Sequence, residues 1–508
     1  MNQGWYLGID LGTGSCKSLV LSREARPLGF ASMEYCAQEV SRRWQEQDPD
    51  ALLGAALSSA KAAMEKAMVD PSHCKGLSLG GALHSLVPLD KSGRPLAGLM
   101  TWADDRAFRQ ASELRGSSLA AELYQETGCP VHPMYPLYKI LWLRQERPEV
   151  FRKARRFVSG KEYVLWKLTG EFLVDYSVAS GSGLLGVRSL RWSPLCLEVA
   201  GIQQRHLSEP APPVRRLGAL RGWVSQELGL PRDVPVFLGS SDAVNSSLGA
   251  GATRSNQATC MVGTSGALRI VSTKPILDAG ARTWCYALDE GHWLVGGAIN
   301  NGGVALSWLV DCVNEALCLA GQKRLMGFED LLVAAQKVEP GADGVICLPF
   351  FAGERSPNWN VHARAAFLGL SLKHGLGHLS RSLIEGIGYR FRSIQEVFSE
   401  LGIELGEVVA SGGFTRSAFW LQVMADILGI PLTVPQWGET SAMGAVLWAL
   451  LGTGALPGLE QMAAVVRQNE RVYPQEINRA LYDRLFSLYK ISYEAMESLW
   501  TQMAEARP

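Results

Sequence analysis

Two short segments rich in glycine and threonine, far apart in the chain, constrain the fold most strongly. The first is DLGTGSCK at residues 10–17, and the second is GTSGALR at residues 263–269. Apolar runs flank each segment, at residues 5–9 and 19–21 in the first case. This pattern predicts a strand, a tight turn and a second strand, with glycine where the backbone needs positive φ or a close approach.

Either segment alone is compatible with an ordinary hairpin. The exposed N–H groups and hydroxyls of such a turn can also surround an anion. Because two copies occur about half a chain apart, they predict a duplicated domain that closes on a polyphosphate from both sides.

Length and charge limit the remaining classes. A chain of 508 residues is too long for one core, so two to four domains are expected. The 49 basic and 49 acidic residues balance, so no overall field attracts nucleic acid or an anionic membrane, and neither is an expected partner. The basic strip from Arg144 to Arg156 is interleaved with glutamates on a predicted helix, which favours a solvated face over a binding patch.

The ten cysteines are scattered and form no C-x-x-C pair. This pattern is typical of a reduced, cytosolic protein, and it indicates neither a disulfide framework nor a zinc site. The N-terminus has no basic segment followed by a long apolar one, and no apolar run approaches 18 residues. We therefore expect a cytoplasmic protein.

Strand signals and helical periodicity alternate along the chain. Helices are expected over 51–68, after Pro136, over 419–428 with Gly429 as the stop, and from Pro474 to the end. Strands are expected at 77–79, 86–89, 234–238, 268–271 and 407–410, and another is expected to end at Val262.

The chain resembles the FGGY carbohydrate kinases from about residue 5 to 455. The resemblance rests on five segments in the order of that family: residues 10–17, 134–146, 263–265, 369–386 and 411–413. It implies an α/β fold with two actin-like (ribonuclease-H-like) domains of mixed sheet with flanking helices, and an active site in the interdomain cleft. It also implies a sugar-binding domain at 1–250, a nucleotide-binding domain at 251–455 and a helical extension at 456–508 packed on the body.

Within this family the chain is most similar to the gluconate kinases. The similar segments are 82–86, 93–96, 101–106, 132–134, 159–163, 175–177 and 296–303. The implied reaction is ATP-dependent phosphorylation of the terminal primary hydroxyl of D-gluconate. Xylulose kinases share the W-x-D-x-R core, so xylulose or another sugar acid or polyol is the alternative substrate. The chain departs from the family pattern at Leu83, where methionine is usual, and at Gly14, Ala243 and His362.

Phosphoryl transfer requires an aligned hydroxyl, donors for the phosphate oxygens and Mg²⁺. Asp242 matches the family's catalytic aspartate, the general base. Its alternative role is to cap a helix that starts near Asn245. Asp10 matches a catalytic residue that holds Mg²⁺ through water, and its alternative is an Asx-turn in a hairpin.

The resemblance also assigns residues to ATP. Gly12, Thr13, Ser15 and Lys17 would serve the γ-phosphate, although Lys17 can instead point outward from its strand. Gly263 and Thr264 would serve the β-phosphate. Nucleotide-lining positions are Gly303, Ser307, Gly412, Gly413 and Ser417, although a glycine pair after a strand is often only a turn.

For the sugar, the matching positions are Leu83, His84, Trp102, Asp104 and Arg106, together with Asp242. Arg106 can take a substrate carboxylate with two hydrogen bonds or form an ion pair with Asp104 or Asp105. A lone histidine such as His84 is usually a satisfied core residue. Lys139 and Trp142 belong to a family signature, but helix packing explains them equally well.

Two other classes share part of this pattern. An actin- or Hsp70-like ATPase would have both phosphate segments but would not need Asp242 or the cluster around Trp102. A pseudokinase would bind sugar without turnover, and the presence of Asp10 and Asp242 argues against it. The expected partners are a small-molecule sugar acid and ATP, and a homodimer is compatible with the family.

Overall fold

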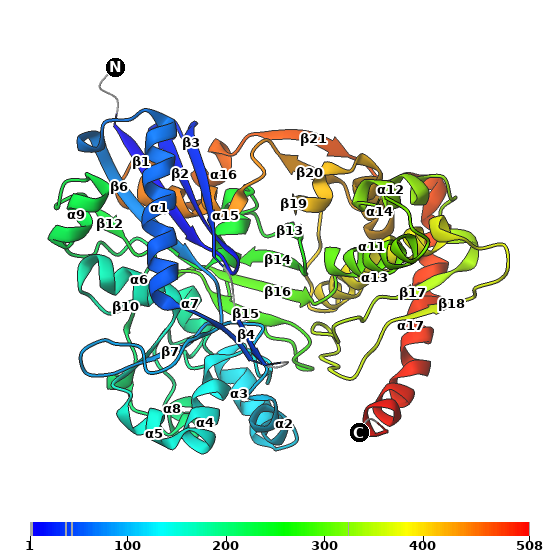
Figure 1. Ribbon diagram of the computed structural model, residues 1–508, viewed down its shortest axis with the longest axis horizontal. Helices are drawn as coiled ribbons and strands as arrows, with labels where there is room; N and C mark the ends of the chain where they lie inside the picture. The colour runs from blue at the N-terminus through cyan, green and yellow to red at the C-terminus, as the bar shows by residue number, and fades with distance from the viewer. Residues whose placement is uncertain (1–3, 36–37, 42–43, 324, 507–508) are drawn as a thin grey trace. The chain divides into compact units, whose positions relative to one another are not determined.

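The computed structural model describes residues 4–35, 38–41, 44–323 and 325–506 (Figure 1). The chain divides into two compact units. The first comprises residues 1–254, 271–295 and 439–467, and the second comprises 255–270, 296–438 and 468–508. Each unit is built from three separate stretches of the chain. The domain boundaries expected at residues 250 and 455 would instead make each domain one continuous stretch, and they remain a prediction.

A mixed sheet forms the centre of the first unit. Its strand order is β12-β6-β1-β2-β3, comprising β12 (Val236–Phe237), β6 (Cys74–Gly81), β1 (Trp5–Leu11), β2 (Ser15–Ser22) and β3 (Pro27–Glu34). The hairpin predicted around the first glycine segment is present, because β1 and β2 pair antiparallel with Asp10 opposite Lys17. β6 runs parallel to β1, and β12 runs parallel to β6. The strand expected over 234–238 is shorter in the structure, since Pro235 cannot donate to a ladder.

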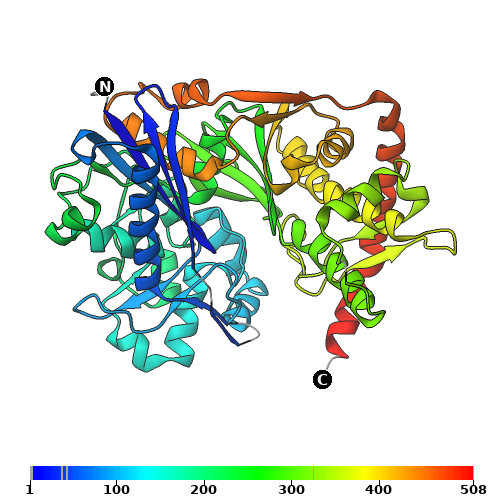
Figure 2. The same ribbon diagram turned by 45° about the horizontal axis from the view of Figure 1, so that its top comes forward.

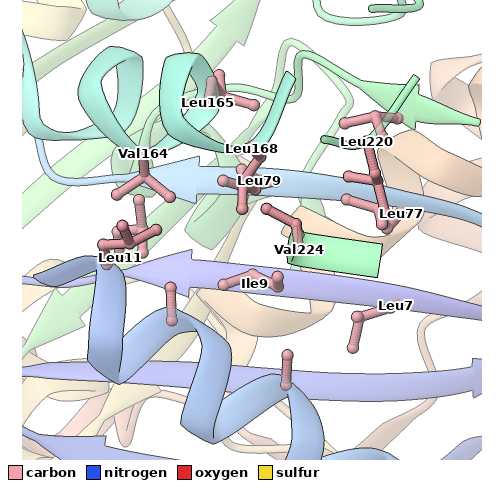
Figure 3. Packing of buried hydrophobic residues seen from close by; sticks show 14 of the residues in the cluster. Leu7, Ile9, Leu11, Leu77, Leu79, Val164, Leu165, Leu168, Leu220 and Val224 are labelled. Carbon is pink, nitrogen blue, oxygen red and sulfur yellow. The ribbon is translucent and has the colours of Figure 1, made fainter. Parts of the chain in front are cut away.

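Strand β1 is buried on both faces. Leu7, Ile9 and Leu11 point into a core cluster that includes residues of α1 (Pro49–Ala67) and α6 (Gly160–Thr169), as Figure 3 shows. The alternate residues point to the opposite face. There a Cβ on Gly8 would lie 2.5 Å from the backbone nitrogen of Val446 in α15 (Thr440–Gly452). Because every residue of β1 is buried, the carboxylate of Asp10 is held among packed elements rather than in solvent.

Helix α1 shows why these residues form a helix. The Asp48 carboxylate accepts a hydrogen bond from the N–H of Asp50 at 2.9 Å, and Pro49 occupies the first turn, where its missing N–H costs nothing. Alanines and leucines on one side of the helix then pack against the sheet. Figures 1 and 2 show α1 lying along the face of strands β1 to β3.

Helices α10 (Asp242–Gly249) and α15 cross with their backbones in contact. A Cβ on Gly249 would lie 1.9 Å from the Thr440 carbonyl oxygen. A Cβ on Gly444 would lie 2.0 Å from the Asn245 carbonyl oxygen. Only glycine permits this approach, and the crossing fixes the first turn of α10, which carries Asp242.

The second unit repeats the same sheet topology. Its strands are β13 (Gln257–Val262), β14 (Gly266–Ser272), β19 (Glu407–Gly412), β20 (Leu432–Pro435) and β21 (Gln468–Val472). β13 and β14 form an antiparallel hairpin around the second glycine segment, and β19 and β20 add in parallel. This succession matches β1, β2, β6 and β12, as a duplicated domain requires.

Helices of the second unit include α11 (Gly303–Leu319), α12 (Phe328–Gln336), α13 (Leu376–Glu400), α14 (Ala418–Leu428) and α17 (Glu476–Glu505). The predicted stop of α14 at Gly429 is present, with φ of 65°. The helix expected from Pro474 onward is α17, which packs against α13, α14 and β17 (Ile346–Leu348).

Further helices and strands complete the two units. In the first unit they are β4 (Gln38–Ser41), β5 (Trp44–Gln47), β7 (Val87–Leu89), β8 (Leu99–Met100), β9 (Arg156–Val158), β10 (Leu173–Asp175), β11 (Glu209–Ala211), β15 (Trp284–Ala287), α2 (Phe108–Arg115), α3 (Leu119–Thr127), α4 (Pro136–Glu146), α5 (Pro148–Lys153), α7 (Tyr176–Ser180), α8 (Pro194–Ala200), α9 (Gly222–Leu228) and α16 (Leu459–Val465). The others are β16 (Trp293–Ile299) and β18 (Ala366–Leu368). Within the described ranges, no helix combines the length and apolarity that crossing a bilayer would require.

The close crossing of α10 and α15 predicts a large stability loss for Gly444→Ala. The new methyl group must displace the Asn245 carbonyl, which should lower the free energy of unfolding by about 1–3 kcal/mol. Gly54→Ala is the matched control, because Gly54 lies exposed in α1 with open space around its Cβ. That variant should gain about 0.5–1 kcal/mol from helix propensity. Urea unfolding measures both, and equal stabilities would contradict the account of the crossing.

Candidate active site

Asp10 is a buried carboxylate at the end of the central strand, with 3% of its surface exposed. Its Oδ2 accepts a hydrogen bond from the Ser441 hydroxyl at 2.6 Å. Its Oδ1 is buried and, within the described residues, has no hydrogen-bond partner. Burial raises the pKa of Asp10 to about 6; the Ser441 hydroxyl opposes this shift, and the negative charge of Asp242 adds to it. The structure does not show the Asx-turn alternative, since neither oxygen of Asp10 accepts from its own loop.

Three hydrogen bonds fix the backbone of the first glycine loop. The loop closes on itself through a 3.1 Å hydrogen bond from the Gly12 N–H to the Ser15 carbonyl. The Tyr35 hydroxyl donates to the Gly12 carbonyl, and the Gln47 amide donates to the Thr13 carbonyl.

Trp102 contacts this loop directly. Its Nε1 donates to the Thr13 hydroxyl oxygen at 3.0 Å. Trp102 and Thr13 therefore lie together, although they were assigned to different ligands from the sequence. Because the hydroxyl oxygen accepts from the indole, the proton of Thr13 is directed elsewhere and remains able to donate.

Lys17 pairs with an acid from the distant end of the chain. Its Nζ lies 2.6 Å from Oε2 of Glu439, and both side chains are about one-third exposed. The Lys17 side chain is therefore partly exposed and held by an ion pair, rather than pointing freely into solvent. An exposed ion pair of this kind is worth about 0–1 kcal/mol, so a stronger anion can displace Glu439 at low cost.

Asp242 opens helix α10 but does not cap it. The cap is Ser241, whose hydroxyl accepts from the Val244 N–H at 3.3 Å, so the capping alternative for Asp242 is wrong. Oδ1 of Asp242 accepts from the Leu83 N–H at 3.3 Å and from the Ala243 N–H at 2.8 Å. These donors orient the carboxyl group.

A buried chain of polar groups supports the residue before Asp242. The Ser241 N–H donates to the Ser177 hydroxyl oxygen at 2.8 Å, and that hydroxyl donates to Asp175. Lys161 completes the chain with a 2.7 Å bond to the other oxygen of Asp175. All four residues are at most 2% exposed. Burial lowers the pKa of Lys161, and the Asp175 charge opposes that shift.

His84 is held in an unusual backbone conformation, with φ of 64°. Its Nδ1 lies 2.6 Å from the Gly181 carbonyl oxygen, so Nδ1 carries the proton in the neutral ring. Its carbonyl accepts from Lys139, which also donates to the Thr101 carbonyl. Lys139 is fully buried, and burial lowers its pKa to about 7. Lys139 therefore ties the His84 segment to the Trp102 segment.

Arg106 is held by two carboxylates of the protein. Its Nε and one terminal nitrogen each donate to Asp104 at 2.7 Å, and that terminal nitrogen lies 2.7 Å from Glu46. The guanidinium carbon also lies 4.5 Å from the centroid of the Trp44 ring and 5.1 Å from that of the Trp142 ring, and these two rings meet edge to face. This geometry favours the structural alternative over capture of a substrate carboxylate, and it explains Trp142 as a packing residue.

In the second unit, the glycine loop after β13 contacts the start of α11. The Gly303 N–H donates to the Gly263 carbonyl at 2.7 Å, and the Gly302 N–H donates to the Thr264 carbonyl at 3.1 Å. A Cβ on Gly302 would lie 2.7 Å from the Ser265 carbonyl oxygen. Ser307 lies one turn along α11 and donates back to Gly303.

Gly412 and Gly413 lie at the same edge of the second sheet as this loop. β13 and β19 are parallel, with Val262 opposite Gly412, so the turns after both strands meet. Gly412 has φ of 92°, and a Cβ there would lie 2.3 Å from the Val262 carbonyl oxygen. Ser417 caps α14 by accepting from the Trp420 N–H at 3.2 Å.

The residues around Asp10 fit Mg²⁺. In the part of the chain that the structure describes, no group of three or more acidic, histidine or cysteine side chains forms a metal cage. The unpartnered Oδ1 of Asp10 offers one hard oxygen ligand, which suits an ion that keeps most of its waters and takes the rest of its ligands from phosphates.

The structure thus brings the predicted residues together in two groups. In the first unit Trp102 contacts Thr13, the Leu83 N–H donates to Asp242, and the charge of Asp242 contributes to the raised pKa of Asp10. Gly263, Thr264, Gly303 and Gly412 meet in the second. The sequence did not point to Ser441, Glu439, Glu46, Tyr35 or Gln47. Short motifs carry no signal for these residues, since Ser441 and Asp10 are 431 positions apart.

The chain is similar in sequence and in structure to several known proteins. A gluconokinase of Bacillus licheniformis is 33% identical, covering 98% of each chain, and a xylulose kinase of Staphylococcus epidermidis is 27% identical, covering 97% of each. The crystal structures of gluconate kinase and ligand-bound xylulose kinase from Lactobacillus acidophilus both have a TM-score of 0.93 and 28% identity. They cover 99% and 98% of this chain, respectively, and 100% of their own.

These similarities confirm the predicted fold class of two actin-like domains of mixed sheet with flanking helices. The N-terminal domain of the FGGY family of carbohydrate kinases matches residues 5–249, and its C-terminal domain matches residues 258–453. The chain belongs to the FGGY family of carbohydrate kinases, which are ATP-dependent sugar phosphotransferases.

Proposed function

We propose that this kinase phosphorylates the terminal primary hydroxyl of D-gluconate to give 6-phosphogluconate. The observation that carries the substrate assignment is the higher identity to a gluconokinase than to a xylulose kinase at nearly full coverage of both. Structural similarity does not discriminate between them, because the two solved kinases match equally well. Xylulose, or another sugar acid or polyol, is therefore the alternative.

In the proposed mechanism, Asp242 is the general base. Its Oδ1 is oriented by the N–H groups of Leu83 and Ala243, so the carboxyl group is held while it takes the proton of the sugar hydroxyl. The buried chain through Ser177 to Lys161 prevents the turn at Ser241 from shifting. Correct placement matters, because orientation of the reacting groups supplies much of the rate in phosphoryl transfer.

The first loop is proposed to bind the terminal phosphate. Thr13 can donate its hydroxyl proton, since Trp102 occupies its oxygen. Lys17 would exchange Glu439 for phosphate oxygens. In the second unit, Gly263 and Thr264 would serve the β-phosphate, and Gly303, Ser307, Gly412, Gly413 and Ser417 would line the nucleotide.

Asp10 is proposed to hold Mg²⁺, which when bound neutralises phosphate charge. Asp10 would present a negatively charged oxygen to the ion from the end of strand β1. Because a buried carboxylate without a partner costs free energy, binding of a cation there would be favourable. Leu83, His84, Trp102 and Asp104 would shape the sugar site. Arg106 would position Trp44 and Trp142 without gripping the substrate. We place the reaction in the cytoplasm.

A substrate panel tests the proposal. ADP formation is coupled to NADH oxidation with ATP, Mg²⁺ and either gluconate, xylulose, ribulose or glycerol. Gluconate should give the highest kcat/KM. A selective response to xylulose would keep the mechanism and remove the substrate assignment, and ADP release without any sugar would favour an ATPase.

Asp242→Asn tests the base. The amide keeps the shape but cannot accept the hydroxyl proton, so kcat should fall by about 100-fold or more. ATP binding by calorimetry should be unchanged. Asp233→Asn, at an exposed carboxylate of the same unit, is the control and should keep full activity. Near-normal turnover in the Asp242 variant would exclude it as the base.

The raised pKa of Asp10 predicts a pH-dependent stability. The folded pKa of about 6 exceeds the ordinary 3.8, so the neutral form stabilises the fold below pH 4, and this contribution is lost as pH rises through 6. Relative to Asp10→Asn, the wild type should lose about 3 kcal/mol between pH 4 and pH 7. Urea unfolding in the absence of nucleotide measures this.

Added Mg²⁺ supplies the control for that measurement. It should restore part of the lost stability in the wild type and none in Asp10→Asn. A difference in stability between the two proteins that does not change with pH would show that folding does not raise the pKa of Asp10.

A further inference from the structure

Lys139 is a buried lysine to which the proposed reaction gives no role. It lies in α4 and is fully buried. Among the described residues, its Nζ bonds to the carbonyl oxygens of His84, at 2.7 Å, and Thr101, at 2.5 Å, rather than to a carboxylate. Removing such a group from water costs free energy, and lysine is almost never fully buried unless an acid pairs with it. A lysine kept in this position therefore indicates a specific role.

The two carbonyl groups lie where a pair of antiparallel segments separates. Leu86 and Met100 exchange both backbone hydrogen bonds at 2.9 Å. If this ladder continued, the next pair to exchange hydrogen bonds would be His84 and Trp102, two residues further along each segment. Instead each segment enters a turn there, and the His84 carbonyl accepts from Lys139. Lys139 thus replaces a ladder bond from the Trp102 N–H and holds the two segments apart.

The backbone of His84 also depends on α4. Its φ of 64° lies in the left-handed region, which is unfavourable for a residue with a side chain and persists only where the surroundings enforce it. Tyr135 and Lys139 are one turn apart, and both contact His84. The rings of Tyr135 and His84 meet edge to face with centroids 4.9 Å apart, and the Tyr135 hydroxyl is bonded to that of Tyr286 at 2.9 Å. The start of α4 therefore fixes both the ring and the carbonyl of His84.

The separated segments border a cavity. Its lining includes Leu83 and Ser85 from one segment, Thr101 and Trp102 from the other, and Thr13 from the first glycine loop. The Thr101 hydroxyl oxygen is buried and, within the described residues, has no hydrogen-bond partner. Since buried hydroxyls are normally hydrogen-bonded, a ligand that carries hydroxyl groups of its own would satisfy it. The separation that Lys139 imposes thus sets the width of a space suited to a polyol.

We propose that Lys139 is a positioning residue for the sugar, which holds the His84 and Trp102 segments at the separation that sugar binding requires. The proposal rests on the proposed sugar site, to which His84 and Trp102 belong. Lys139 acts through these segments rather than by touching the sugar, because its Nζ is directed at the two carbonyl groups. Without those bonds His84 would leave its left-handed conformation and the walls of the cavity would shift.

The test is Lys139→Met in the full-length enzyme. Methionine has a similar length but cannot donate to the two carbonyl groups. The KM for gluconate, or for xylulose if the wild type prefers it, should rise at least about tenfold because the sugar site is displaced. The dissociation constant of ADP, measured by calorimetry, should stay within about twofold, since ADP lacks the phosphate that Thr13 would bind beside Trp102.

This combination separates positioning from a merely structural role. A general loss of folded enzyme would lower kcat and leave the sugar KM unchanged. Lys139→Gln is a milder second variant, because its shorter side chain keeps an NH₂ donor. It should raise the sugar KM at least about threefold, and it decides the question if Lys139→Met does not fold.

Gln110→Met is the matched control on the same helix. Gln110 is buried in α2, and its amide donates to Gln145 of α4 at 2.9 Å. Its loss should lower the melting temperature without changing the sugar KM, and an equal rise in KM would overturn the proposal.

His84→Ala checks the sugar site itself and should raise the sugar KM. An unchanged KM in that variant would show that the proposed sugar site is wrong, and the role of Lys139 would fall with it. A raised KM in His84→Ala together with an unchanged KM in the Lys139 variants would overturn the positioning role alone.

Discussion

The placement of α15 is the constraint on which the first unit depends. Gly444 allows its backbone to touch that of α10, and Gly8 allows β1 to touch it from the sheet. From this position Ser441 reaches the carboxylate of Asp10, and Trp448 donates to Ser240 in the turn before Asp242. A single helix thus holds both acidic residues of the candidate site, and the close backbone contacts at Gly8, Gly249 and Gly444 make that possible.

Burial of polar groups is the second theme. Asp10 and the chain from Lys161 to Ser241 remove charges from water, which costs free energy that apolar residues would not cost. Lys161 and Asp175 offset that cost with a mutual ion pair, whereas Asp10 has an oxygen with no partner among the described residues. The uncompensated group is the one at which a cation is expected, and the compensated ones are positioning residues. Within the candidate site, the unpartnered oxygen therefore distinguishes Asp10 from the residues of the Lys161 to Ser241 chain.

Local elements were predictable, and distant partnerships were not. The hairpin at residues 10–17, helix α1 and the stop at Gly429 follow from turn, capping and periodicity rules that act over a few residues. For Arg106 the sequence left two roles open, an ion pair with Asp104 or Asp105 and binding of a substrate carboxylate. The first is favoured because Glu46 and the rings of Trp44 and Trp142 also lie against the guanidinium, which the sequence does not reveal. Ser441 and Glu439 were missed because tertiary packing alone brings them to Asp10 and Lys17. The capping role first considered for Asp242 belongs to Ser241, one residue earlier.

The chain order of the first unit has a consequence for synthesis. Its sheet and most of its helices lie before residue 255, but α15 begins only at Thr440. A nascent chain of 400 residues would already contain Asp10, Asp242 and both glycine loops. It would lack α15, which packs against the face of β1 at Gly8. That face of the sheet would therefore stay exposed to water. Completion of the first unit on the ribosome must therefore wait until Gly452, at the end of α15, has emerged.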